Sequence, residues 1–307
     1  MEVLLKGVNF NYQLGGQELA ALKDIDLVIH PGELLAITGE GGSGKSTLAQ
    51  VIAGLLKPTG GQVYWDGQPL WSPKGKRLIT WQGKVGLALQ QPEDQLFAET
   101  VGEDVAFGPR NLGLPPEEVE KRVKEALKKV GLSEEICGCS PFILSGGQKR
   151  RVALAGILAL DPDILILDEP TAGLDPGGRR QVIHIIREFH GRRGKTVILI
   201  SHNMAEVSVL AQRIIVLHRG RIVLSGTPAD VFVRGGQLEE WGLLPPPLTR
   251  VLLELNRKGA DLNLAAFTLK EVEEELWSWL SGRKRCPHLA CGGGENSFRA
   301  GPLPAWR

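Results

Sequence analysis

Short apolar runs spaced along the chain predict strands that alternate with helices. Residues 34–37, 164–168 and 196–200 are almost entirely apolar, which is typical of short strands buried on both faces. Between residues 161 and 218 such strands alternate with helical patterns, and this alternation predicts a parallel sheet. The fold class expected from these patterns is α/β.

The first part of the chain, to about residue 89, begins with a different, antiparallel pattern. Ile25, Leu27 and Ile29 alternate with polar positions, as a half-buried strand requires. Asp66-Gly67 stands between two short strand-like runs and is a strong signal for a tight hairpin turn. A further strand is expected over residues 84–89. These signals add a subdomain of antiparallel strands to the α/β core.

Residues from about 91 to 160 predict a small helical subdomain. Pro116 suits the first position of a helix, and Gly131 suits its end. Between them apolar residues recur at helical spacing. These residues are Val119, Val123, Leu127 and Val130. Two final strands are expected near residues 214–217 and 222–224, followed by a short helix that begins at Thr227-Pro228.

The pattern changes again after Gly235-Gly236, so we expect one domain over residues 1–235 and an appendage after it. One amphipathic helix is expected before Gly259, and Thr268 with Glu271 forms a capping box for a second. These helices over 236–280 either pack on the parent domain or contact a second subunit. From residue 281 the chain is basic and Gly-rich, which predicts a disordered tail over 281–307.

Composition narrows the class of protein. Of the 307 residues 42% are hydrophobic and 23% are charged, as in a globular protein. The 36 Lys and Arg residues are balanced by 35 Asp and Glu residues, which gives no electrostatic case for nucleic acid. No stretch approaches the roughly 20 apolar residues that span a bilayer. The N-terminus shows no signal peptide. Any role at a membrane is therefore expected to depend on partners.

Four cysteines do not make a disulfide framework in a chain of this length. Cys137 and Cys139 are interpreted as reduced loop residues, with a metal site as the alternative. Cys286, His288 and Cys291 give three possible ligands in the tail, whereas a structural zinc site normally has four. Neither group predicts a metal site.

The strongest chemical signal is the segment Gly-Glu-Gly-Gly-Ser-Gly-Lys-Ser at residues 39–46. It matches the phosphate-binding P-loop, in which backbone N–H groups and a helix N-terminus surround phosphate groups. Lys45 is expected to neutralise the β- and γ-phosphates, and Ser46 to bind Mg²⁺. A chance Gly-rich turn is the alternative, but the flanking strand and helix (46–56) favour the P-loop. The predicted nucleotide-binding residues are Gly39, Gly41, Gly42, Ser43, Gly44, Lys45, Ser46 and Thr47.

Acidic and imidazole side chains follow the ends of two predicted strands. Asp168 ends the run 164–168 and is expected to hold Mg²⁺, and Glu169 to orient or deprotonate the attacking water. His202 follows the run 196–200, at the sheet edge where ligands bind in open α/β sheets. It is expected to contact the γ-phosphate and the water. Taken alone, Asp168 and Glu169 would suit a solvated turn, and His202 would suit a structural role.

Residues 144–148, Leu-Ser-Gly-Gly-Gln, follow the P-loop by about 100 residues and precede the strand at 164–168. This segment resembles the signature motif of the ATP-binding cassette (ABC) ATPases, and residues 1 to about 235 resemble their nucleotide-binding domain. The resemblance implies that Ser145, Gly147 and Gln148 reach the γ-phosphate bound by an opposing subunit. It also implies that residues 171–175, which match the D-loop and include Asp175, touch that subunit.

The same resemblance implies two further roles. Tyr12 matches the aromatic residue that stacks on adenine, although an exposed Tyr at a strand end is the alternative. Gln90 matches the Q-loop glutamine, which senses Mg²⁺ and the γ-phosphate and faces a membrane partner. The chain has one P-loop, one signature and no internal repeat. One chain therefore supplies half of an ATPase dimer, which a second copy or a paralogue completes.

Residues 91–109, 145–156 and 168–175 resemble a narrower group, the A components of energy-coupling factor (ECF) transporters and of cobalt and nickel uptake ATPases. The last segment is closest to the second paralogue type. This implies ATP and Mg²⁺ as cofactors, a transmembrane T component, a substrate-binding S component, and a place at the cytoplasmic face of the membrane. The cargo would be a vitamin or a transition-metal ion. Glu40-Gly41, Leu89 and Asn203 depart from the usual pattern without removing a catalytic group.

Two other functions stay open. One is the ATPase of a conventional importer fed by an external binding protein. The other is a non-transport ABC protein that acts on ribosomes or DNA, although such proteins usually join two cassettes or carry long coiled-coil insertions. A simple P-loop kinase would need neither the signature nor the D-loop.

Overall fold

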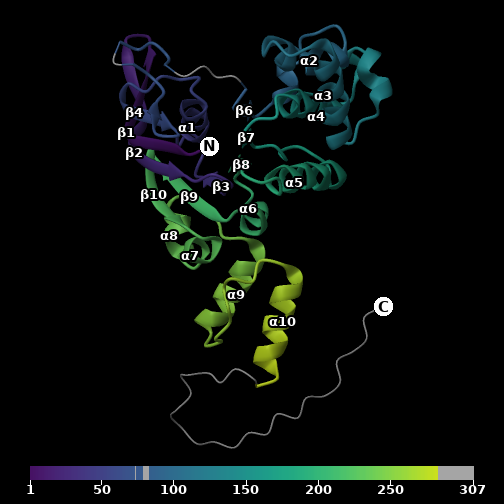
Figure 1. The fold of residues 1–307 in the computed structure, drawn as a ribbon. Helices are drawn as coiled ribbons and strands as arrows, with labels where there is room; N and C mark the ends of the chain where they lie inside the picture. Colours follow the sequence, from purple (N-terminus) through teal and green to yellow (C-terminus); the bar gives the residue numbers. More distant parts are fainter. Residues whose placement is uncertain (73, 79–82, 283–307) are drawn as a thin grey trace, which may run out of the picture. The chain divides into compact units, whose positions relative to one another are not determined.

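A computed structural model describes residues 1–72, 74–78 and 83–282 (Figure 1). The chain divides into two compact units, one formed by Met1–Pro247 and a second that begins at Leu248. No helix in the described ranges is long and apolar enough to cross a membrane. Of the tail predicted over residues 281–307, residues 283–307, with Cys286, His288 and Cys291, lie outside the described residues.

The first unit begins with a four-stranded antiparallel sheet in the order β2-β1-β4-β5. Its strands are β1 (Val3–Leu14), β2 (Gln17–Ile29), β4 (Gly60–Trp65) and β5 (Gln68–Pro69). Asp66 and Gly67 both have positive φ, 46° and 75°, which suits the two central residues of a tight hairpin turn. The predicted hairpin and the antiparallel subdomain are thus confirmed.

A second sheet has six strands in the order β10-β9-β3-β8-β7-β6. The strands are β3 (Leu34–Thr38), β6 (Val85–Ala88), β7 (Ile164–Asp168), β8 (Thr196–Ile200), β9 (Arg213–His218) and β10 (Arg221–Gly226). All neighbours pair in parallel except β9 and β10, which are antiparallel. The predicted parallel sheet and the final strand pair are confirmed.

Successive residues of the central strands enter two different cores, as the two-residue period of a strand requires. Ile164 and Ile166 pack with the antiparallel sheet and with helix α1 (Lys45–Ile52), whereas Leu165 and Leu167 pack with the helices on the other face. Helix α1 is shorter than the predicted 46–56. Gly54, with φ of 67°, ends the helical conformation because right-handed helices have negative φ.

The helical subdomain lies between β6 and β7. Its helices are α2 (Val101–Asn111), α3 (Pro116–Lys129) and α4 (Gly146–Ala159), with three short 3₁₀ turns: η1 (Pro92–Gln95), η2 (Glu134–Gly138) and η3 (Pro141–Ile143). Figure 1 shows α2, α3 and α4 grouped beside β6 and β7. The predicted helix that begins at Pro116 and ends before Gly131 is confirmed.

Helices α5 (Pro176–His190) and α6 (Met204–Leu210) follow β7 and β8, and α7 (Pro228–Phe232) and α8 (Gly235–Glu240) complete the first unit. Helices α9 (Pro247–Arg257) and α10 (Leu269–Leu280) share a small core around Leu252 and Val272. The capping box of Thr268 and Glu271 is confirmed at the start of α10. The domain boundaries proposed at residues 235 and 280 stay predictions.

Two glycines of similar backbone conformation allow a direct test of the antiparallel sheet. Gly61 (φ 76°) and Gly67 (φ 75°) both adopt the left-handed region, but a Cβ at Gly61 would lie 2.2 Å from the carbonyl oxygen of Gly7, whereas one at Gly67 meets nothing within 4 Å. We expect Gly67→Ala to destabilise the fold by about 1 kcal/mol, the cost of left-handed backbone. Gly61→Ala should cost at least about 3 kcal/mol, because it adds a backbone clash to the same strain.

The measurement is the midpoint of urea unfolding for both variants. Equal midpoints for Gly61→Ala and Gly67→Ala would contradict the close approach of β4 to Gly7.

Candidate functional site

The P-loop joins β3 to α1, and two of its glycines are required by close contacts. A Cβ at Gly39 would lie 2.1 Å from the carbonyl oxygen of Leu217, and one at Gly44 would lie 2.5 Å from that of Ala21. Gly41 and Gly42, by contrast, are exposed, and a Cβ at either would meet no atom within 4 Å. One side of the loop is therefore packed against the fold, and the other is open to a ligand.

Lys45 lies across this loop. Its Nζ donates to the carbonyl oxygens of Gly39 and Glu40, both at 2.8 Å. Burial lowers the pKa of Lys45, and the nearby carboxylates of Glu169, Asp168 and Glu40 oppose that effect by raising it. The ammonium group is thus held inside the site, close to where the P-loop prediction places the phosphates.

Ser43 supplies a test of whether an anion fits the loop. Its side chain is 1% exposed, and its Oγ has no hydrogen-bond partner among the described residues. A buried hydroxyl without a partner is costly, since the group loses its hydrogen bonds to water. A phosphate oxygen held by the loop would accept a hydrogen bond from this group. The residues present therefore fit the predicted nucleotide.

Ser46 and Asp168 come together at the predicted Mg²⁺ site. The Ser46 side chain forms a hydrogen bond with the Asp168 carboxyl group. Burial raises the pKa of Asp168; the Ser46 bond lowers it, the neighbouring Glu169 raises it, and Lys45 lowers it. No cluster of three or more His, Cys, Asp or Glu residues able to hold a metal occurs in the described parts of the chain. One carboxylate and one hydroxyl suit Mg²⁺, which takes its remaining ligands from substrate phosphates and water.

Glu169 and His202 form a pair that the sequence prediction had placed only in the same region. Glu169 is buried and has φ of 50°, and its backbone N–H donates to the carbonyl oxygen of Ile200. Its Oε1 accepts a hydrogen bond from the backbone N–H of His202 at 3.1 Å and lies 2.7 Å from His202 Nδ1. The carboxylate is therefore held in one orientation by the end of the neighbouring strand. The parallel pairing of β7 with β8 was the signal that could have predicted this contact.

Tyr12 lies beside the start of α1. Its hydroxyl is 3.1 Å from Thr47 Oγ1, and its ring meets that of Phe10 edge to face at 4.9 Å. The side chain is partly buried, so Tyr12 is not simply a free strand end. This position, next to the P-loop helix, is compatible with the predicted contact to a base, which stays a prediction.

The signature residues form a second, separate group. Ser145 caps α4, and the Gln148 side chain accepts from the Ser145 N–H at 3.0 Å, which completes a capping box. Asp175 caps α5 by accepting from the N–H of Gly178 at 2.6 Å. Ser145, Gly147, Gln148 and Asp175 line a common hollow of about 450 Å³, which no P-loop residue lines. One chain thus carries two separate half-sites.

Gln90 follows β6, and the structure brings it to Arg150 rather than to the Mg²⁺ site. The Gln90 side chain is exposed, and the backbone carbonyl oxygen of Gln90 accepts from Arg150 Nη2 at 3.4 Å. No hydrogen bond of its side chain with Ser46 or Asp168 is present among the described residues, so its role toward Mg²⁺ stays a prediction. Arg150 itself was given no role from the sequence, because helix α4 has apolar residues on all sides and its period does not reveal a buried cation.

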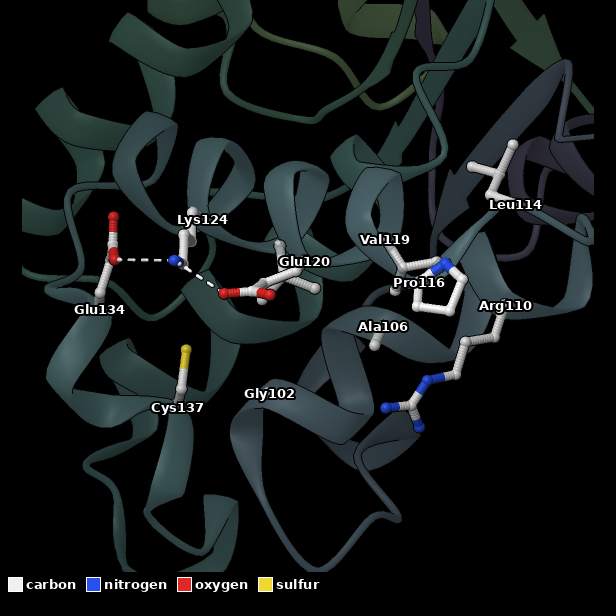
Figure 2. Close-up of a pocket in the computed structure, with 11 residues that line it drawn as sticks. Gly102, Ala106, Arg110, Leu114, Pro116, Val119, Glu120, Lys124, Glu134 and Cys137 are labelled. Atoms are coloured by element: carbon white, nitrogen blue, oxygen red, sulfur yellow. Dashed lines mark ion pairs between the residues drawn. The ribbon is translucent and has the colours of Figure 1, made fainter.

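A cavity of about 670 Å³ lies on the helical subdomain, between α2 and α3 (Figure 2). Lys124 bridges Glu120 at 2.8 Å and Glu134 at 4.0 Å along its rim. Cys137 also lines it, as a free thiol whose pKa is raised by burial. A raised pKa disfavours the reactive thiolate. None of the predicted site residues lines this cavity, and we assign no chemistry to it.

Comparison with known proteins gives two family models and many relatives. The model "ABC transporter" matches residues 22–172, and "AAA domain, putative AbiEii toxin, Type IV TA system" matches residues 140–208. The chain is 47% identical over 285 residues to "Energy-coupling factor transporter ATP-binding protein EcfA2" of Caldanaerobacter subterraneus subsp. tengcongensis, covering 92% of this chain and 99% of the relative. The protein of the same name from Clostridium tetani is 46% identical over 260 residues, with 84% and 90% covered.

Solved structures agree with these sequence relatives. One solved structure is described as "Structure of cbiO1 from clostridium perfringens: Part of the ABC transporter complex cbiONQ". Its sequence is 38% identical to this chain, the TM-score is 0.67, and the match covers 82% of this chain and 98% of that one. A second is described as "Dimeric structure of a post-hydrolysis state of the ATP-binding cassette MJ0796 bound to ADP and Pi". Its sequence is 32% identical to this chain, the TM-score is 0.65, and the match covers 73% of this chain and 98% of that one.

Glu40 places an acidic side chain inside the phosphate-binding loop. Its Oε1 lies 3.3 Å from His218 Nδ1, and its negative charge acts on Lys45. We expect Glu40→Gln to tighten binding of a non-hydrolysable ATP analogue by roughly two- to fivefold, because a charge that repels the phosphates is removed while solvent screens part of the effect.

Titration calorimetry at constant ionic strength measures this, with Glu117→Gln on the exposed face of α3 as the control. Weaker binding by the Glu40 variant would mean that the Glu40–His218 contact organises the loop more than its charge opposes the ligand.

Proposed function

The chain belongs to the ABC transporter family of ATP-binding proteins, and from this premise we propose that it is the ATP-hydrolysing motor subunit of an ECF-type importer. The predicted ABC-type fold is confirmed by the solved relatives. The observation that carries the proposal is the Glu169–His202 pair, held next to Lys45 and the Ser46–Asp168 contact. The extended identity with the EcfA2 relatives supports the ECF assignment.

In the proposed reaction each residue has one task. Lys45 binds the β- and γ-phosphates, and Ser46 and Asp168 hold Mg²⁺, which supplies positive charge to the transferring phosphoryl group when bound. Glu169 orients the attacking water and accepts its proton. His202 fixes the Glu169 carboxylate through two contacts, and in the proposed reaction it also contacts the γ-phosphate.

A second ABC subunit is needed to complete the site. The hollow formed by Ser145, Gly147, Gln148 and Asp175 is lined by no P-loop residue, so within one chain it does not face that chain's own nucleotide. The N-terminus of α4 offers free N–H groups to the γ-phosphate of another subunit. A solved relative is described as dimeric. The partner ATPase is either a copy of this chain or a paralogue.

An exposed aromatic pair supports a docking surface for a membrane partner. Phe97 and Phe107 are 59% and 50% exposed, and their rings meet edge to face at 4.8 Å. Both line a hollow of about 520 Å³ close to η1, whose floor includes Leu96 and Ile157. Exposed aromatic groups beside an apolar hollow are typical of interaction sites. We assign this surface, defined by Phe97, Phe107 and the hollow, to the transmembrane T component.

The remaining parts of the proposal concern the assembly. The chain would act at the cytoplasmic face of the membrane, together with a T component and an S component that captures the cargo. A vitamin or a transition-metal ion suits this class. The cargo pocket would lie in another polypeptide. A conventional binding-protein-dependent importer is the alternative, and a non-transport ABC protein is not supported by any feature of this chain.

Substitution of the general base tests the ATPase chemistry. We expect Glu169→Gln to lower kcat for ATP hydrolysis by at least about 100-fold, since the water loses its proton acceptor. ATP affinity should stay within about twofold, because Glu169 makes no ground-state contact that the proposal requires. Initial rates and equilibrium ATP binding measure the two effects. Hydrolysis at the wild-type rate would remove Glu169 from this role.

Removal of one exposed aromatic ring tests the membrane partner. Tagged chain is purified from detergent-solubilised native membranes, and every co-purifying protein is identified. We expect a second ABC ATPase, a T-like membrane protein and small S-like proteins with the wild-type chain, and we expect Phe107→Ala to lose most of the membrane proteins, because truncating a central aromatic anchor costs about 2 kcal/mol or more of binding.

Leu55→Ala is the matched control, since Leu55 is 58% exposed but lies after α1, away from the hollow. Recovery of two conventional permease subunits would favour the alternative importer. Equal recovery with Phe107→Ala and Leu55→Ala would place the docking surface elsewhere.

A further inference from the structure

Arg150 is a buried cation that contacts two loops of different function. It lies five residues into α4, and only 6% of it is exposed. On one side its Nε and Nη2 donate to the two carboxylate oxygens of Glu93 in η1, both at 3.2 Å. On the other side its Nη1 donates to the carbonyl oxygen of Ala172 at 2.6 Å, in the D-loop. One guanidinium group therefore joins η1 to the D-loop.

The geometry is specific to arginine. The group also reaches the carbonyl oxygens of Pro170 at 3.5 Å and Gln90 at 3.4 Å. A guanidinium is planar and holds its donors in a fixed fork, so contacts made on its two edges are rigidly related to each other. A displacement of η1 is therefore transmitted to the D-loop rather than absorbed by side-chain rotation.

The D-loop is held from its other side as well. Thr171 Oγ1 donates to Glu206 Oε2 at 2.7 Å, and Glu206 also forms an ion pair with Arg179. Glu206 belongs to α6, the helix that follows His202 and Asn203. Thr171 also follows Glu169 by only two residues. Contacts thus run from η1 through Arg150 to the D-loop and to α6, and the backbone connects these two segments directly to Glu169 and His202.

We propose that Arg150 is a positioning residue that couples the membrane-facing segment around η1 to the Glu169–His202 pair. The inference rests on the proposed function, because η1 lies next to the surface assigned to the T component. A movement of that partner against η1 shifts Glu93, and Arg150 carries the shift to residues 170–172. The position of Glu169 then changes relative to the phosphate loop, and hydrolysis follows the state of the membrane partner.

Three variants separate the two edges of the guanidinium. Arg150→Gln removes both connections, and Arg150→Lys keeps the charge near Glu93 but loses the fork. Glu93→Gln weakens only the contact to η1 and leaves the D-loop contacts in place. The control is Arg122→Gln, since Arg122 also pairs with a glutamate (Glu118, 3.0 Å) and donates to backbone carbonyls at the end of α4, but touches neither loop.

The measurements are kcat and KM for ATP, with the ATPase pair (this chain and the copy or paralogue that completes its site) and with the complex recovered from membranes, and the Tm of each variant. We expect Arg150→Gln to lower kcat by about tenfold or more with KM within about twofold, because misplacement of catalytic groups acts on the reaction step. Arg150→Lys should fall between this variant and the wild type. Glu93→Gln should keep most of the rate of the ATPase pair without membrane proteins but lose stimulation by the membrane partners.

A merely structural role would appear in Tm and not in kcat. If Arg150→Gln and Arg122→Gln lose similar Tm and retain similar kcat, or if Glu93→Gln is stimulated as strongly as the wild type, the proposal is overturned. The outcome is separable from the function itself. Absence of a membrane complex with the wild-type chain would count against the ECF assignment, while the split between kcat and KM for the ATPase pair would still decide the role of Arg150.

Discussion

The parallel pairing of β3, β8 and β7 is the constraint on which the rest of the site depends. These strands are adjacent in the six-stranded sheet, and their carboxyl ends meet at one edge. The P-loop leaves β3, Asp168 ends β7, and His202 follows β8 within two residues. Strand pairing therefore brings together side chains that are far apart in the sequence. The register of Asp168 opposite Ile200 fixes where the Glu169 carboxylate meets His202.

Much of this arrangement follows from local sequence, and the reason is physical. Buried strands are short apolar runs. The P-loop is defined by glycines, and at two of them a side-chain Cβ would lie within 2.5 Å of a backbone carbonyl oxygen. That Lys45, Ser46 and Asp168 lie in one region was therefore predictable from residue type and order. The end of α1 was not, because helical periodicity continues past Gly54 and only backbone conformation stops the helix at Ile52.

Contacts between separate segments were harder to predict. The Glu169–His202 contact joins residues 33 positions apart, and strand register rather than either local motif determines it. Arg150 could not be assigned because a positive residue next to Arg151 in the sequence normally indicates a solvated face. Its burial depends on Glu93 and on carbonyls from two other loops, none of which the sequence places nearby. The roles predicted for Tyr12 and Gln90 concern a bound ligand and stay predictions.

The separation of the P-loop from the signature hollow has a consequence for genetics. If two copies of this chain pair, each composite site takes its phosphate loop from one copy and its signature from the other. A chain damaged only at Lys45 and a chain damaged only at Ser145 are then each inactive alone, yet a mixed pair contains one site with both lesions and one with none. Such alleles would complement each other when expressed together. If the natural partner is a paralogue, co-expression of the two alleles would rescue nothing, because no pair would contain an undamaged version of both contributions from this chain.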